Sequence, residues 1–165
     1  MRESRVRFIR QQGFNNPTTD DLYSALMLQP RIIGVVVGLG ILMQSPSIFL
    51  ALAAVLWWSA LVPTHNPFDA IYNHGVAYRR GLPPLGAAPA PRRFAAGLAG
   101  TFALAIGVAL LEGATPAAWV IEALLAVAVM AVVFGDSCAG ANLYHLLRRR
   151  LTMGPSPSSS ATVRD

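Results

Sequence analysis

The sequence predicts an all-α integral membrane protein in which four transmembrane helices form two hairpins. Three observations lead to this prediction. Hydrophobic residues make up 54% of the 165-residue chain and charged residues only 13%, whereas a soluble domain carries about 25% charged residues. The hydrophobic residues gather into four apolar runs, which pair across short turns. The arginines flank these runs, as positive charges do in membrane proteins.

The first hairpin is predicted over residues 30–62. Its apolar runs cover residues 32–43 and 48–62, and the turn between them contains Ser45 and Pro46. A serine N-cap followed by proline at the first helical position is typical of a helix start. At about 1.5 Å per residue, each run is shorter than a hydrocarbon core of about 30 Å. We therefore expect membrane thinning, flanking residues or a partner to complete this hairpin, and a re-entrant hairpin is the alternative.

The second hairpin, together with the helix end that follows it, is predicted over residues 94–150. Its apolar runs cover residues 94–111 and 117–134, and Thr115-Pro116 between them repeats the Ser-Pro pair of the first hairpin. A Pro-Arg pair also precedes each hairpin. The two hairpins therefore have the pattern of a weak internal duplication.

The loop between the hairpins, residues 63–93, contains an expected amphipathic helix. Asn66 is a favourable N-cap, and Pro67 is favourable at the first helical position. Apolar side chains then recur at helical spacing, with polar side chains opposite them. The expected apolar face consists of Phe68, Ile71, Tyr72 and Val76, and the expected polar face of Asp69, Asn73 and Arg80. This pattern predicts a helix that lies in the cytoplasmic interface of the membrane.

The two ends of the chain are predicted to lie outside the membrane domain. Residues 1–29 form an N-terminal segment with a short interfacial helix, which begins after the hydroxyl caps Thr18 and Thr19 and is interrupted by Pro30. Residues 151–165 are rich in proline and serine, and this composition is typical of a flexible tail.

The orientation follows from the arginines. Neither hairpin tip contains an arginine, whereas the N-terminal segment, the central loop and the start of the tail all do. The positive-inside rule therefore places both termini in the cytoplasm. This topology accounts for the net charge of +5, so nucleic acid is not an expected partner.

Cys138 is the only cysteine and the first candidate for chemistry. It follows the last apolar run, two residues after Asp136. With a nearby acid or base and a lowered pKa, such a thiol acts as a redox or sulfur-transfer nucleophile. The simpler interpretation is a half-buried packing residue, which the lack of a second, resolving cysteine favours.

Other residues are candidates for binding or packing. His65 and His145 are weak candidates as cofactor ligands, for example of a chlorin-type pigment, but with His74 they follow no standard metal-binding spacing, so no metal site is predicted. Glu122 is ionisable and lies inside an apolar run, which marks it as a functional candidate, although a structural role is favoured. Small residues at helical spacing permit close helix packing or partner contacts, and these are Gly34, Gly38, Ala96, Gly100 and Gly107.

Several short motifs follow one another along the chain. They are the proline after Ser45, Asn66-Pro67-Phe68, Pro91-Arg92-Arg93-Phe94 and the closing Cys138-Ala139-Gly140-Ala141-Asn142-Leu143-Tyr144. In this order they resemble a bacterial membrane family catalogued as domain of unknown function 4395, over residues 30–150. The closing motif of that family is Cys-x-Gly-Cys-x-Leu-Tyr, and Ala141 stands here in place of the second cysteine. The resemblance implies a helical scaffold in the bacterial inner membrane and thioredoxin-like or sulfurtransferase partners, while the missing cysteine argues against a two-thiol redox role.

Two functions from different classes follow. The first, which we expect, is a non-enzymatic accessory or scaffold subunit of a larger inner-membrane assembly of photosynthetic or respiratory type. Its partners would be the lipid bilayer and other membrane subunits, and the sequence requires no cofactor. The second is a membrane-anchored thiol- or sulfur-handling partner of a thioredoxin-like or sulfurtransferase protein, with Cys138 as its nucleophile. A small-molecule transporter is a weaker third option, because the sequence contains no discontinuous helix or buried polar track.

Overall fold

The structure, a computed structural model, describes residues 3–14 and 20–152. All regular secondary structure in these residues is helical. The helices are α1 (Glu3–Gln11), α2 (Asp20–Met43), α3 (Pro46–Leu61), α4 (Pro67–Tyr72), the π-helical turn η1 (Asn73–Ala77), α5 (Tyr78–Arg80), α6 (Ala90–Leu111), α7 (Thr115–Gly135) and α8 (Ala139–Thr152). The predicted all-α class is therefore confirmed for this part of the chain.

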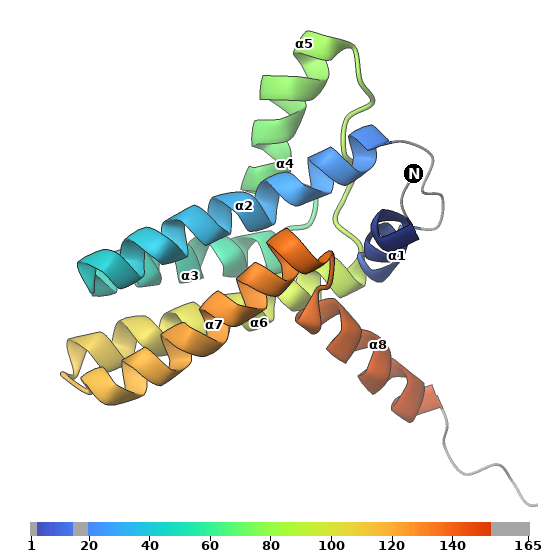
Figure 1. The fold of residues 1–165 in the computed structure, drawn as a ribbon. Helices are drawn as coiled ribbons and strands as arrows, with labels where there is room; N and C mark the ends of the chain where they lie inside the picture. The colour runs from blue at the N-terminus through green and yellow to red at the C-terminus, as the bar shows by residue number, and fades with distance from the viewer. Residues whose placement is uncertain (1–2, 15–19, 153–165) are drawn as a thin grey trace, which may run out of the picture.

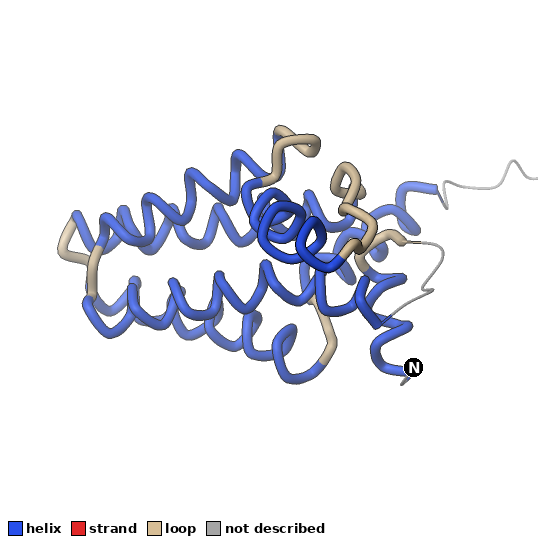
Figure 2. The backbone as a smooth tube through the Cα atoms, turned by 90° about the horizontal axis from the view of Figure 1, so that it is seen from above, coloured by secondary structure: helices blue, strands red, loops and turns tan. Residues whose placement is uncertain are grey.

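Two helical hairpins form the body of the molecule (Figure 1). One hairpin consists of α2 and α3, the other of α6 and α7, and both tips point the same way in Figures 1 and 2. Helix α3 packs along α6, and α2 packs along α7. Each helix of one hairpin therefore packs against one helix of the other. The shorter helices α1, α4, α5 and α8 gather at the opposite end of the bundle.

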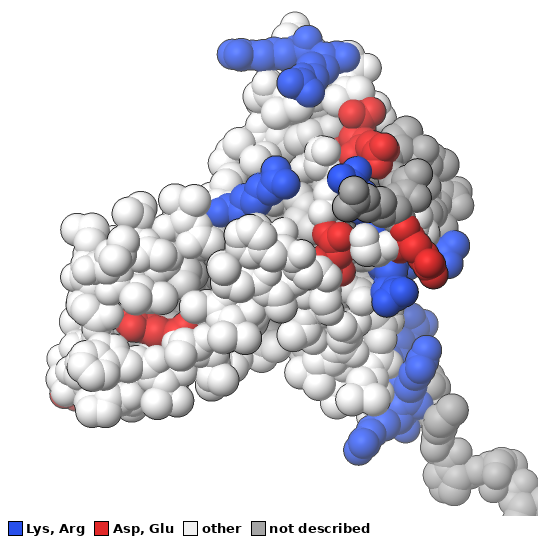
Figure 3. Space-filling model, in the orientation of Figure 1, with Lys and Arg blue, Asp and Glu red and all other residues white. Residues whose placement is uncertain are grey.

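Three of the described helices are long and apolar enough to cross a membrane. They are α2, α6 and α7, with 24, 22 and 21 residues. Helix α3 is also apolar but has only 16 residues, or about 24 Å at about 1.5 Å per residue. This composition is that of a membrane protein. In Figure 3 the basic side chains lie toward the end that carries the shorter helices, and the hairpin tips show none on this face.

Helix α2 corrects the prediction that Pro30 ends an interfacial helix. The helix continues through Pro30, so the expected boundary between residues 29 and 30 falls inside one 24-residue element. Proline removes one backbone hydrogen bond, and helices tolerate this loss where neighbouring elements hold both sides. Met27 before the proline and Ile33 after it are both buried against other helices. As a result α2 is about 36 Å long at about 1.5 Å per residue. The prediction that the first helix is short is therefore wrong.

The central loop contains the predicted helix, with one important difference. Asn66 caps α4 by accepting a hydrogen bond from the backbone N–H of Phe68 at 3.0 Å, as expected. Phe68 and Tyr72 of the expected apolar face are buried within the protein, whereas Ile71 of the same face is 52% exposed. Asp69, however, was expected on a solvated polar face and is buried. The sequence pattern was misleading because this carboxylate is paired inside the protein.

The chain termini and two of the caps differ in detail from expectation. The expected hydroxyl caps Thr18 and Thr19 and the tail from residue 153 lie outside the described residues. Pro46 begins α3 as predicted, but the Ser45 side chain makes no capping hydrogen bond. Thr115 is itself the first residue of α7 and does not cap it. Helix α1 was not predicted, and its residues Phe8 and Ile9 pack into a buried cluster with α2 and the start of α8.

Candidate functional site

A buried ion pair joins three elements near the base of the bundle. Arg92, in the first turn of α6, donates from Nη1 and Nη2 to the two carboxylate oxygens of Asp69 at 3.0 and 2.6 Å. It also donates from Nε and Nη2 to Oε1 of Gln29, on α2, at 3.1 and 2.7 Å. Arg92, Asp69 and Gln29 are 5%, 6% and 7% exposed. The bidentate hydrogen bonds from Arg92 to Asp69 and its two hydrogen bonds to Gln29 hold α2, α4 and α6 together in a defined geometry.

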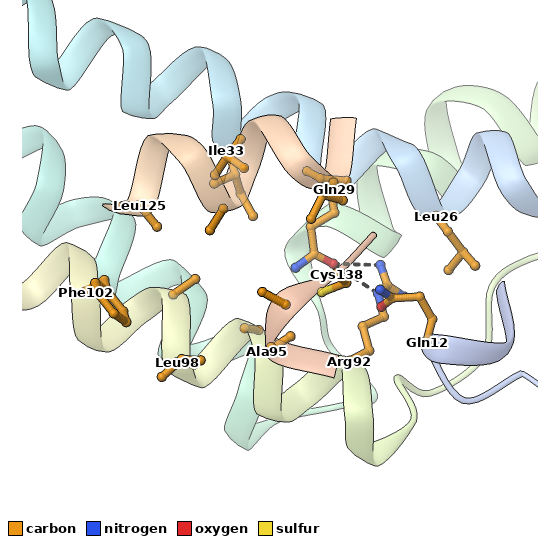
Figure 4. Close-up of a pocket in the computed structure, with 18 of the residues that line it drawn as sticks. Gln12, Leu26, Gln29, Ile33, Arg92, Ala95, Leu98, Phe102, Leu125 and Cys138 are labelled. Carbon is orange, nitrogen blue, oxygen red and sulfur yellow. Dashed lines mark hydrogen bonds between the residues drawn. The ribbon is translucent and has the colours of Figure 1, made fainter. Parts of the chain in front are cut away.

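A cavity of about 240 Å³ lies beside this ion pair. Helices α2, α6 and α7 form most of its wall, and α1 and the start of α8 close one end. The wall is mainly apolar, with Phe102 and Leu125 on one side and Gln12, Gln29, Arg92 and Cys138 toward the base (Figure 4). An apolar hollow with a few convergent polar groups is the usual form of a small-molecule site.

Cys138 lines this cavity and is 8% exposed. Its backbone N–H donates to Oε1 of Gln11 at 3.3 Å, which ties the start of α8 to α1. The carboxylate of the nearby Asp136 accepts a hydrogen bond from the hydroxyl of Tyr23, and Asp136 adopts a left-handed backbone conformation, with φ of 50°, where α7 ends. In this arrangement Asp136 orients the turn, and Cys138 is held among apolar neighbours.

Glu122 lies between the hairpins near their tips. It is 3% exposed, and its two carboxylate oxygens accept hydrogen bonds from Nε2 of Gln44 at 3.3 and 3.1 Å. Nε2 of Gln44 also donates to the carbonyl of Ile41 at 2.9 Å, and Oε1 of Gln44 accepts from Nε1 of Trp119 at 3.0 Å. These bonds connect the tip of the first hairpin to α7. The structure therefore gives Glu122 the partners that a structural role requires.

The histidines have separate partners. Nδ1 of His65 lies 2.9 Å from Oγ1 of Thr64, and Nδ1 of His74 lies 3.0 Å from the carbonyl of Ala70. Nε2 of His145 lies 3.1 Å from the carbonyl of Gln11, and since a carbonyl only accepts, that nitrogen carries the proton. Among the described residues, no group of three potential metal-ligating side chains comes together.

The small residues divide into internal and outward positions. A Cβ at Gly100 would lie 2.9 Å from Cδ1 of Trp57, and a Cβ at Gly107 would lie 2.8 Å from the side chain of Leu50. These two glycines therefore permit the close packing of α6 on α3, and Ala96 on the same helix is buried. A Cβ at Gly34 would lie 3.2 Å from Val129 of α7, whereas a Cβ at Gly38 would meet no atom within 4 Å.

A second hollow, of about 550 Å³, separates α1 from α8. Its wall includes Arg7, Arg10, Arg149 and His145. Arg7 is partly balanced by Glu3, with 4.0 Å between the charged atoms. The concentration of arginine at this end of the molecule agrees with charges placed at a membrane surface.

Sequence reasoning missed the ion pair and the polar side of the cavity. Arg92 was assigned to the flanking arginines, and Gln12 and Gln29 were not singled out. No sequence signal joins Arg92 to Asp69, 23 positions away, because their contact depends on how α4 folds back on α6. Asp69 itself gave no signal of the pair, since an acid in the first turn of a helix is stable there without a buried partner.

A comparison with family models finds a match over most of the chain. The sequence model of the family described as Domain of unknown function (DUF4395) matches residues 25–149, which include the ion pair, the cavity-lining stretches of α2, α6 and α7, and Cys138. No curated protein and no solved structure gives a significant match. The chain belongs to the DUF4395 family of proteins.

Proposed function

We propose that this protein is a non-enzymatic accessory or scaffold subunit of a larger assembly in the bacterial inner membrane. In this proposal both hairpins cross the bilayer, with α3 shorter than the usual span, and both termini lie in the cytoplasm. The short α3 is then completed by local thinning of the membrane or by a neighbouring subunit.

The observation that carries the proposal is the open position at Gly38. On α2, Val35, Leu39 and Leu42 are 65%, 49% and 83% exposed and surround a glycine at which a Cβ would meet nothing. Small residues within such an apolar stripe let another transmembrane helix approach closely. The glycines at 100 and 107, by contrast, are already used within the bundle. We therefore place the contact with another transmembrane helix at Gly38.

The use of the buried polar residues supports the same role. Arg92 with Asp69 connects three elements at the base, and Glu122 with Gln44 connects the hairpins at the tips. Each of these charged groups holds one part of the fold against another. Such internal ties favour a stiff framework that presents its outer helix faces to neighbouring subunits.

The test is purification from native membranes in a mild detergent, with mass spectrometry of the subunits and an absorption spectrum. The variant is Gly38→Leu, which the open position should accommodate without disturbing the fold. The matched control is Ala123→Leu, at an exposed position of α7. Gly34 is left unchanged because a side chain there would press on Val129.

The proposal expects the unmodified chain and Ala123→Leu to purify in fixed ratio with other membrane subunits. Gly38→Leu should insert at the same level and with the same helical content but lose at least one of those subunits. Absorption bands would show whether the assembly is photosynthetic or respiratory. Retention of every partner by Gly38→Leu, at the ratio found for the control, would refute the proposed contact.

A thiol-handling role for Cys138 is the second candidate. The observation in its favour is that Cys138 lines a cavity, and its burial counts against direct attack on a soluble partner. Maleimide labelling of the folded protein tests it, with a membrane-permeant and an impermeant reagent. Rapid labelling by both, together with loss of function in Cys138→Ala cells, would support this role. Labelling only after unfolding, with full function of Cys138→Ala, would exclude it.

A further inference from the structure

Small side chains create the cavity between the hairpins. Alanines 95, 96 and 99 of α6 line it together with Ala128 of α7, and Gly140 at the start of α8 also contributes to the wall. Larger side chains at the alanine positions would occupy part of this space, whereas a Cβ at Gly140 would lie 2.9 Å from Ala95. The cavity of about 240 Å³ is therefore lined by small residues from three helices and does not result from one poorly packed side chain.

The cavity contains a hydrogen-bond donor that has no acceptor among the described residues. Gln29 is 7% exposed, and its Oε1 accepts both bonds from Arg92. Because arginine only donates, the amide must face Arg92 with its oxygen, and its NH₂ group must face the other way. Figure 4 shows this nitrogen pointing away from Arg92, toward the side of the cavity where Phe102 and Leu125 lie. No hydrogen bond from Nε2 of Gln29 to a described residue exists.

A second buried amide lies at the same end of the cavity. Gln12, just after α1, is 6% exposed and lines the wall. Its side chain makes no hydrogen bond to the part of the chain that the structure describes. Buried polar groups are almost always paired with protein or another partner. Among the described residues, no fully buried side-chain nitrogen or oxygen lacks a partner. The NH₂ group of Gln29 is therefore without an acceptor because it faces the open space of the cavity, where a bound molecule can supply one.

The charges around the cavity determine what kind of acceptor fits. Arg92 is the charged residue in the wall, and the carboxylate of Asp69 neutralises it through two hydrogen bonds. Four of the N–H donations from Arg92 are already made to Asp69 and Gln29. An anion would thus find no free positive charge. A neutral acceptor on an apolar molecule would find the free NH₂ of Gln29.

We propose that this cavity binds a neutral, lipid-soluble molecule that carries a carbonyl group. The carbonyl oxygen accepts a hydrogen bond from Nε2 of Gln29. The apolar body of the molecule lies along Ile33, Phe102 and Leu125, between α2, α6 and α7. Membrane quinones and the esters of membrane lipids both have this chemistry.

The test measures binding to the purified full-length protein in detergent. The probes are a fully ring-substituted benzoquinone with a decyl tail, a fatty acid methyl ester and decylbenzene, which lacks a carbonyl. Full ring substitution leaves the Cys138 thiol no open ring carbon to attack. Thermal unfolding is followed against the mole ratio of probe to detergent, because a ligand that binds only the folded state raises the midpoint. Mass spectrometry of an organic extract identifies any molecule that copurifies.

Two variants locate the binding. Gln29→Glu conserves the shape of the side chain and keeps an oxygen toward Arg92. The ionised carboxylate adds a negative charge and only accepts hydrogen bonds, so it repels a carbonyl oxygen. Ala128→Phe fills the cavity, and its matched control is Ala131→Phe, at an exposed position of the same helix. A carbonyl probe should bind the unmodified protein and Ala131→Phe alike. Gln29→Glu should bind it about tenfold more weakly, which corresponds to about 1.4 kcal/mol.

The outcomes separate the possibilities. Binding of the quinone but not the ester, or of the ester but not the quinone, identifies the source of the carbonyl. Equal binding of decylbenzene and the carbonyl probes would overturn the proposal, as would unchanged carbonyl binding in Ala128→Phe. Should Gln29→Glu not fold, the comparison of Ala128→Phe with Ala131→Phe and the comparison among probes still decide it.

Discussion

Replacement of Asp69 by asparagine is expected to destabilise the protein strongly. The change removes the negative charge opposite Arg92 and conserves the size of the side chain. Arg92 is 5% exposed, and its Nη1 and Nη2 lie 3.0 and 2.6 Å from the carboxylate oxygens. Asparagine can accept with one oxygen only, and its NH₂ group would face a guanidinium N–H, so one donor would meet another.

The magnitude follows from the burial of the pair. Removing one partner of a buried ion pair leaves an uncompensated charge and costs about 3–5 kcal/mol. A matched control is Asp20→Asn, because Asp20 pairs with Arg5 at 3.2 Å with side chains 65% and 37% exposed. An exposed pair of this kind contributes about 0–1 kcal/mol. The two aspartate substitutions should therefore differ by several kcal/mol.

Reversible unfolding in mixed micelles measures this difference. The mole fraction of a denaturing detergent is raised while far-ultraviolet circular dichroism follows the helices. A double variant, Asp69→Leu with Arg92→Met, removes both charges and should recover most of the stability lost in Asp69→Asn, since apolar replacements of a whole buried pair are often neutral or stabilising. Equal, small losses in Asp69→Asn and Asp20→Asn would refute the reasoning and show that water reaches the pair.

Three further predictions use the same unfolding assay. Gly40→Ala should destabilise the protein by about 1–3 kcal/mol through overpacking, because its Cβ would lie 2.8 Å from the ring of Phe49. Gly38→Ala should be neutral or stabilise by up to about 1 kcal/mol through helix propensity, because its Cβ would meet no atom. Equal effects of the two substitutions would contradict this prediction. Asn66→Ala should cost about 1 kcal/mol through loss of the α4 cap, and no change would show that the cap is dispensable. Glu122→Gln should cost less than about 1.5 kcal/mol because one acceptor remains for the amide at the hairpin tip, and Glu122→Lys should cost much more; similar costs would refute the tip contact.

Local signals in the sequence predicted much of the secondary structure. Proline is favoured in the first turn of a helix, where its missing N–H is not needed. Pro46, Pro67 and Pro116 lie in the first turns of α3, α4 and α7. The cap at Asn66 was predicted for the same kind of reason. These features depend on neighbours within a few residues, so the sequence alone was sufficient.

The prediction for Pro30 was wrong because tertiary packing of α2 outweighs the local tendency of proline to end a helix. Proline weakens an isolated helix, but Met27 and Ile33 are buried on either side of it and hold α2 in one piece. The error shortened the first helix in the prediction and made the whole first hairpin seem too short. Only α3 is short in the structure.

The sequence by itself determined the all-α class, the two hairpins and the arginine-rich end, because hydrophobic runs, helix-start residues and charge position each act locally or through the solvent. Only the tertiary structure decided that Asp69 is buried on Arg92, that Gln29 presents a free NH₂ to a cavity, and that Gly38 is open while Gly100 is filled. The physical reason is that these properties arise between residues distant in the chain. Hydropathy and spacing describe each helix alone, and they carry no information on which face of one helix meets which face of another.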